Sequence, residues 1–283
     1  MRSMEMRVNT FNLVHTFQSA QPVTFFGSLD GNSGAVSYVS SGNPVRVTQL
    51  SPGIVRIESP DLEAAASDFR ERFRMSDDMR RIYEDIAIDQ FMRDAVRKYS
   101  GLRLTLNDPW ETTVVFVLSQ FNNIKRIRLI TSRLIDRFGE ESAHGVKSFP
   151  TPEALSRATI AELNECGMGF RSRYMKAVAG TCADGLDLGR YRGKDYAAVK
   201  GMLMELPGIG DKVADCIALM GYGKLEAFPI DTWVKRTLER LYFNGKSTGI
   251  KRLHESVSGK WGGMQGYAQL YLYHHGRIDG NEA

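Results

Sequence analysis

The sequence contains few cysteines and no long hydrophobic run. Its three cysteines, Cys166, Cys182 and Cys216, are too few and too scattered for a disulfide framework, and their spacing matches no zinc site. The longest apolar run, VVFVL at 114–118, is far too short to cross a bilayer. The N-terminal residues lack the apolar core of a secretory signal. These absences predict a cytoplasmic protein in a reducing compartment, with no membrane partner, no disulfide framework and no zinc site among its cysteines.

A strong excess of charge is also missing. The 37 Lys and Arg residues nearly balance the 33 Asp and Glu residues, which leaves a net charge of +4 over 283 residues. This mild excess is weak evidence for a polyanionic partner, so an argument for nucleic-acid binding must rest on where the basic residues lie. The length suffices for two or three modest domains with a well-buried core.

The first sixty residues predict a sheet, and the remainder predicts helices. From residue 8 to about residue 60, five short β-prone runs alternate with Gly, Asn, Ser and Pro: FNLVHTF, PVTFFGSL, AVSYVSS, VRVTQL and IVRIES. From Asp61 onward, apolar residues recur at three- and four-residue steps, as in amphipathic helices. The pattern predicts an α+β fold, with a small antiparallel sheet domain ahead of two mainly helical domains. We place these domains at residues 1–105, 106–225 and 226–283.

Several helix ends carry local signals. Gly139 follows a long amphipathic run, as a C-cap glycine would. Thr151 with Pro152 is expected to open one short helix, and Thr159 is expected to open the next.

The segment at about 195–221, DYAAVKGMLMELPGIGDKVADCIALMG, predicts a helical hairpin. Pro207 ends the first helix, and Gly208 and Gly210 can adopt positive φ where the chain reverses. Without side chains in the way, the turn can present backbone N–H groups to an anion such as a DNA phosphate. An ordinary turn between two helices explains the same glycines.

Lys212 stands in the first turn of the second helix of the hairpin, where the helix dipole disfavours a cation. Cys216 lies one turn further on the same face. Partly apolar surroundings are expected to lower the lysine pKa, and a neutral amine is what nucleophilic catalysis at carbon requires. A solvated surface lysine is the simpler alternative.

Asp231 follows the short apolar run FPI and precedes an amphipathic helix, which is the N-cap position. A structural cap would explain this residue completely. Its carboxylate would also stabilise positive charge on a sugar whose glycosidic bond breaks through an oxocarbenium-like state.

The turn, the lysine and the aspartate together resemble the helix–hairpin–helix DNA glycosylases, and LPGIGDKVADCIALM with FPIDTW is similar to the 8-oxoguanine branch of that superfamily. Other segments resemble this branch in the same order: FRMSDDMRRIYEDI, YSGLRLTLNDPWE, NNIKRI, CGMGFRSRYM and GGMQGYAQLYLYHHGR. The resemblance extends over roughly residues 10–278 and is strongest after residue 70. It implies the architecture predicted above and a prokaryotic member of the branch, archaeal members included.

The resemblance implies a bifunctional enzyme of base excision repair, a DNA N-glycosylase with AP lyase activity. Lys212 would attack C1′ of a nucleotide flipped out of the duplex, and Asp231 would support the developing positive charge. The resulting Schiff base would permit β-elimination, which cleaves the strand. The implied partner is duplex DNA with 8-oxoguanine opposite cytosine, bound by a monomer. No cofactor is implied, and whether the hairpin carbonyls bind a cation stays open.

The resemblance also assigns residues that would recognise the base. Gln269 would read the Watson–Crick edge of the flipped purine, Tyr273 would stack on one face and Cys216 would cover the other. Simpler roles exist, since Tyr273 fits an aromatic core stripe and Cys216 a small buried hydrophobe. Gln269 is harder to explain in this way, because an amide among apolar neighbours must find partners.

A second set of residues would contact the DNA. Arg126 and Arg171 would reach the orphaned cytosine, Phe170 would be the wedge, and Asn123, Gly208 and Gly210 would help to shape the contact. A solvated helix face explains Arg126 equally well.

Three positions depart from the pattern of the branch. Phe121 replaces an asparagine of eukaryotic members, which bears on discrimination of the opposite base. Trp233 replaces a histidine and would stack on or flank the extruded nucleotide. Ala20 stands where the branch has a glycine whose carbonyl senses the N7 hydrogen of 8-oxoguanine.

Two other functions remain open from the sequence. The first is a glycosylase of the same superfamily that removes another damaged base. The second is a non-catalytic DNA-binding protein. Branches with a C-terminal iron–sulfur cluster are excluded, because no cysteine follows Cys216.

Overall fold

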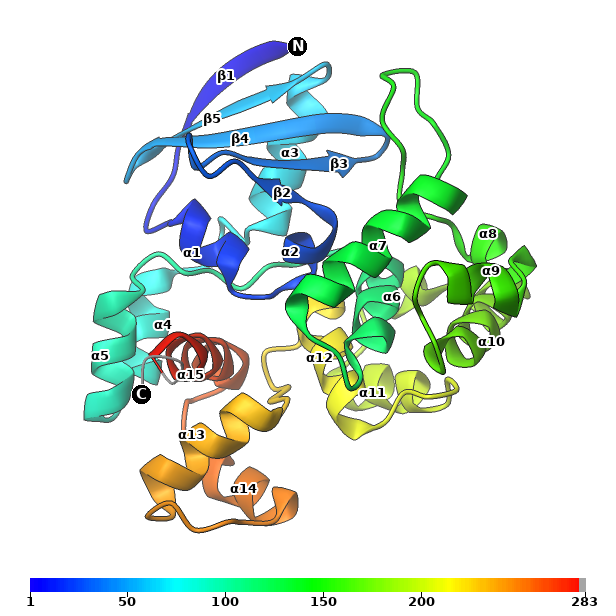
Figure 1. Ribbon diagram of the computed structural model, residues 1–283. Coiled ribbons are helices and arrows are strands. Elements are labelled where there is room, and N and C mark those ends of the chain that lie inside the picture. The colour runs from blue at the N-terminus through cyan, green and yellow to red at the C-terminus, as the bar shows by residue number, and fades with distance from the viewer. Residues whose placement is uncertain (280–283) are drawn as a thin grey trace.

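The computed structural model describes residues 1–279 and contains one small sheet packed against many helices (Figure 1). The sheet is antiparallel throughout, with the strand order β1-β5-β4-β3-β2. Its strands are β1 (Arg2–Arg7), β2 (Ser28–Leu29), β3 (Val36–Ser40), β4 (Asn43–Ser51) and β5 (Ile54–Ser59). The predicted α+β class, with the sheet at the front, is confirmed.

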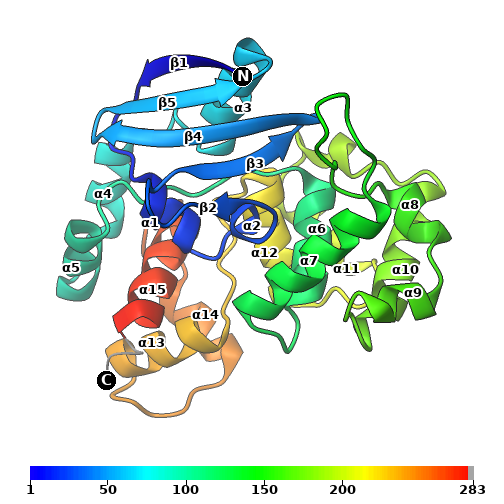
Figure 2. The same cartoon turned by 45° about the horizontal axis from the view of Figure 1, so that its top comes forward.

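Two of the five predicted strand runs are wrong, because FNLVHTF and PVTFFGSL form mainly the helices α1 (Leu13–Gln18) and α2 (Pro22–Phe26). The Asn12 side chain caps α1 by accepting a 2.9 Å hydrogen bond from the His15 N–H. Pro22 opens α2, where its fixed φ suits the first helical turn. These local signals outweigh the β propensity of the Val, Thr and Phe residues. Figure 2 shows both helices below the sheet, next to α15 and α7.

Helices follow the sheet along the chain, as predicted. Before the hairpin they are α3 (Leu62–Arg72), α4 (Met79–Ile86), α5 (Gln90–Lys98), α6 (Pro109–Ser119), α7 (Ile124–Phe138), α8 (Pro152–Arg157), α9 (Ile160–Glu165), α10 (Arg171–Ala183) and the 3-10 turn η1 (Leu188–Tyr191). The others are α11 (Tyr196–Met204), α12 (Asp211–Tyr222), α13 (Thr232–Tyr242), α14 (Ile250–Val257) and α15 (Gln265–Asp279).

The predicted helix ends are observed. Thr151 caps α8, and Thr159 caps α9 in a reciprocal capping box with Glu162. Gly139 is the C-cap residue of α7, but its backbone is extended (φ −74°, ψ 142°) rather than left-handed.

Residues 1–279 form two hydrophobic cores. The smaller core lies between the sheet and α3 and contains residues from Val8 to Phe73. The larger core joins the helices, and it includes α15 packed against α4, α5 and α13. The Tyr271 hydroxyl donates a 2.9 Å hydrogen bond to the Leu102 carbonyl, which ties α15 to the segment after α5. The domain boundaries at residues 105 and 225 stay a prediction.

Within residues 1–279, none of the helices combines the length and the apolar composition that a membrane crossing requires.

Candidate active site

The hairpin consists of α11 and α12, and it lies between the α6–α10 helices and the α13–α15 group (Figure 1). Helix α11 ends at Met204, three residues before Pro207, so the proline follows the helix end rather than forming it. Lys200 of α11 forms ion pairs with two aspartates of α12 and so connects the two helices. Its Nζ lies 2.7 Å from Asp211 Oδ1 and 2.9 Å from Asp215 Oδ1.

The two glycines of the turn differ in conformation. Gly208 has φ +79°, and a Cβ there would lie 2.5 Å from the ring of Tyr174, so this position requires glycine. Gly210 has φ −91° and ψ 177°, an extended conformation open to any residue, so the expected positive φ is wrong there. A Cβ at Gly210 would meet nothing within 4 Å. No side chain caps α12, so its first N–H groups lack a side-chain acceptor.

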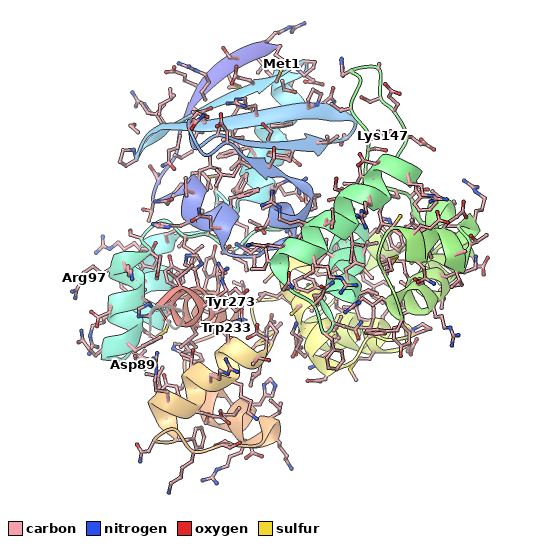
Figure 3. The ribbon with its side chains drawn as sticks, viewed as in Figure 1. Met1, Asp89, Arg97, Lys147, Trp233 and Tyr273 are labelled. Atoms are coloured by element: carbon pink, nitrogen blue, oxygen red, sulfur yellow. The ribbon has the colours of Figure 1, made fainter. Side chains whose placement is uncertain are left out.

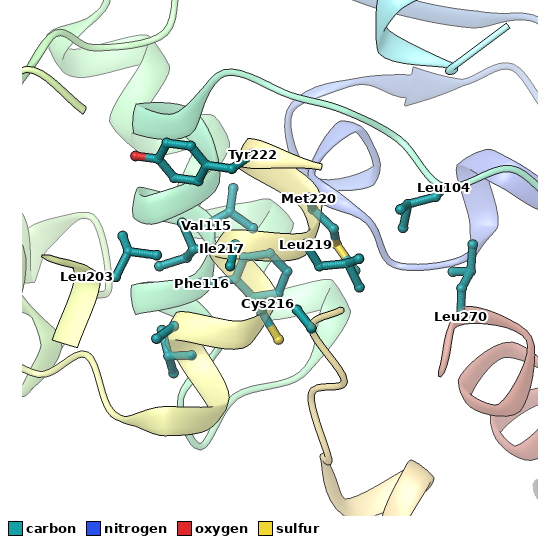
Figure 4. Packing of buried hydrophobic residues seen from close by; sticks show 14 of the residues in the cluster. Leu104, Val115, Phe116, Leu203, Cys216, Ile217, Leu219, Met220, Tyr222 and Leu270 are labelled. Carbon is teal, nitrogen blue, oxygen red and sulfur yellow. The ribbon is translucent and has the colours of Figure 1, made fainter. Parts of the chain in front are cut away.

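Lys212 lies half-buried in the first turn of α12, with its Nζ 5.8 Å from the centroid of the Phe116 ring on α6. Figure 4 shows Phe116 and Cys216 close together between these helices. The predicted lowering of the Lys212 pKa is wrong. The pKa is raised, first by the charge that Cys216 carries when its thiol is ionised and then by Asp231, against burial, which lowers it.

Cys216 is buried, and burial raises the pKa of its thiol to about 11 although the charge of Lys212 opposes this rise. The thiol is therefore neutral at physiological pH. Under those conditions Asp231 is the remaining anion among the groups that raise the Lys212 pKa, and it stabilises the ammonium form.

Asp231 is the N-cap residue of α13, as predicted, and its Oδ1 accepts a 2.8 Å hydrogen bond from the Val234 N–H. Burial raises the pKa of its carboxyl, against the backbone hydrogen bonds and the positive charge of Lys212. The same carboxylate thus caps one helix and is electrostatically coupled to the lysine of another.

Gln269 on α15 has a buried side-chain amide whose nitrogen is hydrogen-bonded and whose oxygen is not. Its Nε2 donates a 3.1 Å hydrogen bond to the Pro229 carbonyl, two residues before Asp231. Its Oε1 is buried and has no hydrogen-bond partner within residues 1–279. A buried acceptor without a partner is rare in a folded protein and is free to bind a ligand donor.

Tyr273 lies one helical turn beyond Gln269 and is half-buried. Burial raises the pKa of its hydroxyl, and Asp231 and Cys216 both couple to it, so the tyrosine belongs to the same cluster. Trp233 stands in the first turn of α13, with the Arg236 guanidinium 5.7 Å from its ring centroid. Figure 3 labels Tyr273 on α15 and Trp233 at the start of α13, two helices that pack against one another.

The loop between α1 and α2 carries Ala20, whose φ of +59° is left-handed. This conformation favours glycine over a residue with a side chain. The next residue, Gln21, is fully buried, and its Nε2 donates to the Ser19 hydroxyl (2.8 Å) and to the Arg103 carbonyl (2.9 Å). Its Oε1 accepts from the Thr105 N–H at 2.7 Å, so the amide fixes the loop.

Arg277 connects this loop to the cluster. It donates a 2.5 Å hydrogen bond to the Gln18 carbonyl, and its guanidinium lies 5.5 Å from the Tyr273 ring centroid. Its charge is the last of the effects that oppose the rise of the Asp231 pKa. Neither Gln21 nor Arg277 was predicted as a site residue. Their sequence signals were a polar residue between Ala20 and Pro22 for Gln21, and the end of the segment GGMQGYAQLYLYHHGR for Arg277.

The expected DNA-contact residues lie at the starts of α7 and α10. Asn123 caps α7 by accepting from the Arg126 N–H at 3.0 Å, and the exposed Arg126 guanidinium donates to the Gly167 carbonyl at 3.4 Å. Phe170 is 52% exposed. Arg171, in contrast, is only 4% exposed, and its guanidinium points to main-chain carbonyls. A pocket of about 740 Å³ lies here, lined by Arg126, Asn164, Gly169, Phe170, Arg173 and Tyr174.

The whole chain is similar to known DNA repair proteins. A probable N-glycosylase/DNA lyase of Methanothermobacter thermautotrophicus is 30% identical over 260 residues, which cover 81% of each chain. The solved structure of MBOgg1 in complex with a low-affinity DNA ligand superimposes with a TM-score of 0.90 at 29% identity, over 98% of this chain and 96% of the other. The 8-oxoguanine glycosylase/lyase of Clostridium acetobutylicum, in complex with double-stranded DNA containing cytosine opposite 8-oxoguanine, gives 0.88 at 26% identity over 98% of each chain.

The family described as HhH-GPD superfamily base excision DNA repair protein matches residues 114–261, which include the hairpin and Asp231. This match spans more than half of the sequence, and the relative from Methanothermobacter thermautotrophicus matches 81% of the chain. The chain belongs to the HhH-GPD superfamily of base excision DNA repair proteins.

Proposed function

We propose that this chain is a bifunctional DNA glycosylase and AP lyase that excises 8-oxoguanine from duplex DNA. The observation that carries the proposal is the coupling of Lys212 to Asp231 beside an amide with an open acceptor, Gln269. The likeness to a solved 8-oxoguanine glycosylase/lyase over 98% of both chains supports the same activity.

In the proposed reaction, the ammonium of Lys212 gives a proton to the departing base, and its nitrogen then bonds to C1′. The glycosidic C1′–N9 bond breaks, and its electron pair leaves with the base. The Asp231 carboxylate stabilises the positive charge on the sugar during this step. The Asp231 carboxylate suits this sequence, because beside it Lys212 begins as an ammonium acid and becomes a nucleophile only as the base leaves.

The second reaction is strand cleavage. The sugar ring opens to give a protonated Schiff base between Lys212 and C1′. Loss of a C2′ proton then breaks the C3′–O bond, and the 3′ phosphate leaves with that electron pair. Water hydrolyses the Schiff base and regenerates the lysine.

The base pocket divides recognition between two groups. The open Oε1 of Gln269 would accept an N–H of the purine Watson–Crick edge, while Tyr273 and Cys216 flank the ring faces and Trp233 borders the extruded nucleotide. This edge is the same in guanine and in 8-oxoguanine. The Ala20 carbonyl would therefore distinguish 8-oxoguanine from guanine, because it would accept the N7 hydrogen that only the oxidised base carries.

The partner in this proposal is duplex DNA with the lesion opposite cytosine. The turn at Gly208 and Gly210 and the uncapped start of α12 would receive a backbone phosphate, and Asn123 and Arg126 would contact the duplex next to the lesion. The proposal further takes the enzyme to act as a monomer in the cytoplasm of a prokaryote.

The test is a single-turnover incision assay with sodium borohydride trapping, on duplexes that carry 8-oxoguanine opposite each of the four bases. Undamaged guanine, an alkylated purine and an oxidised pyrimidine serve as control substrates. A trapped adduct is expected with 8-oxoguanine, and it should disappear in Lys212→Gln but persist in Lys251→Gln, which removes an exposed lysine of α14.

Other outcomes would overturn the proposal in distinct ways. An adduct formed only with another lesion would retain the chemistry and reassign the base pocket. The absence of any adduct, together with DNA binding, would leave a non-catalytic DNA-binding protein.

A further inference from the structure

The loop between α6 and α7 holds its largest apolar side chain in solvent. Phe121 is 95% exposed, and its φ of +46° is left-handed. A bulky residue in this conformation is an outlier, and a fully exposed aromatic ring gains little from burial within the chain. Such strain persists only where surrounding contacts enforce it, and it concentrates at functional sites.

Arg171 enforces this conformation. Its Nε donates a 2.8 Å hydrogen bond to the Gln120 carbonyl, and its Nη2 donates a 2.9 Å hydrogen bond to the Phe121 carbonyl. Nη1 reaches the Met168 carbonyl at 3.2 Å, so one guanidinium joins the loop before α7 to the loop before α10. With the side chain 4% exposed and its donors directed at main-chain oxygens, Arg171 is not poised to read a base.

Because Arg171 joins these two loops, the exposed aromatic rings of Phe121 and Phe170 lie close together. The ring centroids of Phe121 and Phe170 lie 6.4 Å apart, and those of Phe170 and Tyr174 lie 6.3 Å apart. The Arg171 guanidinium covers one side of Phe170, 4.4 Å from its centroid. The two phenylalanines therefore form one apolar ridge, next to the exposed basic residues Arg126 and Arg173.

We infer that Phe121 and Phe170 form a two-ring wedge that fills the space left by the extruded nucleotide, with Arg171 as the positioning residue that braces it. This inference rests on the proposed function. Aromatic rings stack on any base because every base has a π face, and phenylalanine has no hydrogen-bonding group to select one. Phe121 therefore contributes affinity at a damaged site whatever base stands opposite. Of Arg126 and Arg171, it is the exposed Arg126 that is placed to read that base.

The experiment measures equilibrium binding to duplexes with a tetrahydrofuran abasic-site analogue opposite each of the four bases. This analogue contains no base to excise, so the result does not depend on which lesion the enzyme removes. The proteins are the wild type, Phe121→Ala, Phe170→Ala, and a matched control, Leu129→Ala, which removes a side chain that is 50% exposed on α7. Undamaged duplex gives the reference affinity.

We expect Phe121→Ala to weaken binding to all four duplexes by about tenfold, which is the scale of one lost stacking interaction. Phe170→Ala should act similarly, and Leu129→Ala should bind as the wild type does. Equal binding by Phe121→Ala and the wild type would overturn the inference. A loss restricted to the duplex with cytosine would also overturn it, since Phe121 would then be a selective reader.

The role of Arg171 is tested in a double-mutant cycle with Phe121→Ala. Arg171→Met should weaken binding in the wild-type background and have little further effect in Phe121→Ala, because its action passes through the loop. Arg171→Lys, which keeps the charge, supplies a second variant if Arg171→Met does not fold. In the Phe121→Ala background, Arg171→Met or Arg171→Lys could also change which of the four opposite bases is bound most tightly. That result would identify Arg171 as a base reader instead.

Failure of the proposed function gives a different pattern. A wild type that binds the abasic duplexes with the expected dependence on Phe121 but does not incise 8-oxoguanine would keep the wedge and refute the lesion assignment. A wild type that does not distinguish abasic from undamaged duplex would refute both.

Discussion

The amide of Gln269 on α15 donates a 3.1 Å hydrogen bond to the Pro229 carbonyl, two residues before the Asp231 carboxylate. This contact fixes the orientation of the side chain and leaves Oε1 buried without a partner in the described part of the chain. We therefore predict that Gln269→Ala lowers kcat/KM for 8-oxoguanine excision by about 10- to 100-fold, the scale of one lost hydrogen bond to a base in a buried site.

Binding of the same variant to a tetrahydrofuran duplex provides the control, because that ligand has no base to reach the pocket. Gln269→Ala should bind it as the wild type does. An equal loss of affinity for the abasic duplex would mean that Gln269 supports the packing of α15 and does not read the base.

Lys212→Gln and Asp231→Asn separate the nucleophile from its electrostatic partner. Lys212→Gln should bind damaged DNA normally and form no borohydride-trapped adduct, since its amide cannot form a Schiff base. Asp231→Asn should slow excision by about 10²- to 10³-fold while the midpoint of thermal unfolding changes little, because asparagine is as good an N-cap as aspartate. A changed Kd with an unchanged single-turnover rate would reduce Asp231 to a cap or a DNA-positioning residue.

Those features that depend on neighbouring residues were predictable from the sequence. Thr159 and Glu162 cap each other across three residues, and Asp231 caps its helix through Val234, so both ends were expected correctly. The helices α1 and α2 were missed although Asn12 and Pro22 are equally local signals. There the β propensity of the intervening Val, Thr and Phe residues received too much weight.

Features that depend on distant residues were not predictable. Arg171 is buried because its partner carbonyls at Gln120 and Phe121 lie about 50 residues earlier. Gln21 is fixed by Arg103, 82 residues later. The pKa of Lys212 was expected to fall because the helix dipole and burial were weighed without the charge of Asp231, which lies on another helix and which the fold brings beside it.

Gly208 and Gly210 should respond in opposite ways to alanine. Gly208→Ala places a Cβ at left-handed φ and against the Tyr174 ring, so we expect a loss of about 1–3 kcal/mol in the free energy of unfolding. Gly210→Ala meets open space in an extended backbone and should cost less than about 0.5 kcal/mol. Its methyl group would instead stand before the start of α12 and weaken binding to a tetrahydrofuran duplex.

Thermal unfolding and equilibrium binding of the two glycine variants check this contrast. Unchanged DNA affinity in Gly210→Ala would mean that no phosphate approaches the backbone at this residue. Unchanged stability in Gly208→Ala would contradict the close contact with Tyr174.

Glu111, in the first turn of α6, makes stability depend on pH near neutrality. Its Oε2 is buried without a partner in the described residues, and burial raises the pKa of its carboxyl from 4.5 to about 7, although Arg72 opposes the rise. Between these two pH values the folded chain holds a proton that the unfolded chain has lost. The contribution of Glu111 to stability therefore falls as pH rises through this window, by up to about 3 kcal/mol, and the loss is complete above pH 7.

Glu111→Gln removes this titration while it keeps the shape of the side chain. The variant should gain stability relative to the wild type as pH rises from 4.5 to 8, whereas Glu84→Gln, which changes an exposed glutamate of α4, should show no such trend. The measurement is the difference in denaturation midpoint between each variant and the wild type across this range. A constant difference for Glu111→Gln would show that Glu111 is ionised in the folded chain throughout, with Arg72 compensating its burial.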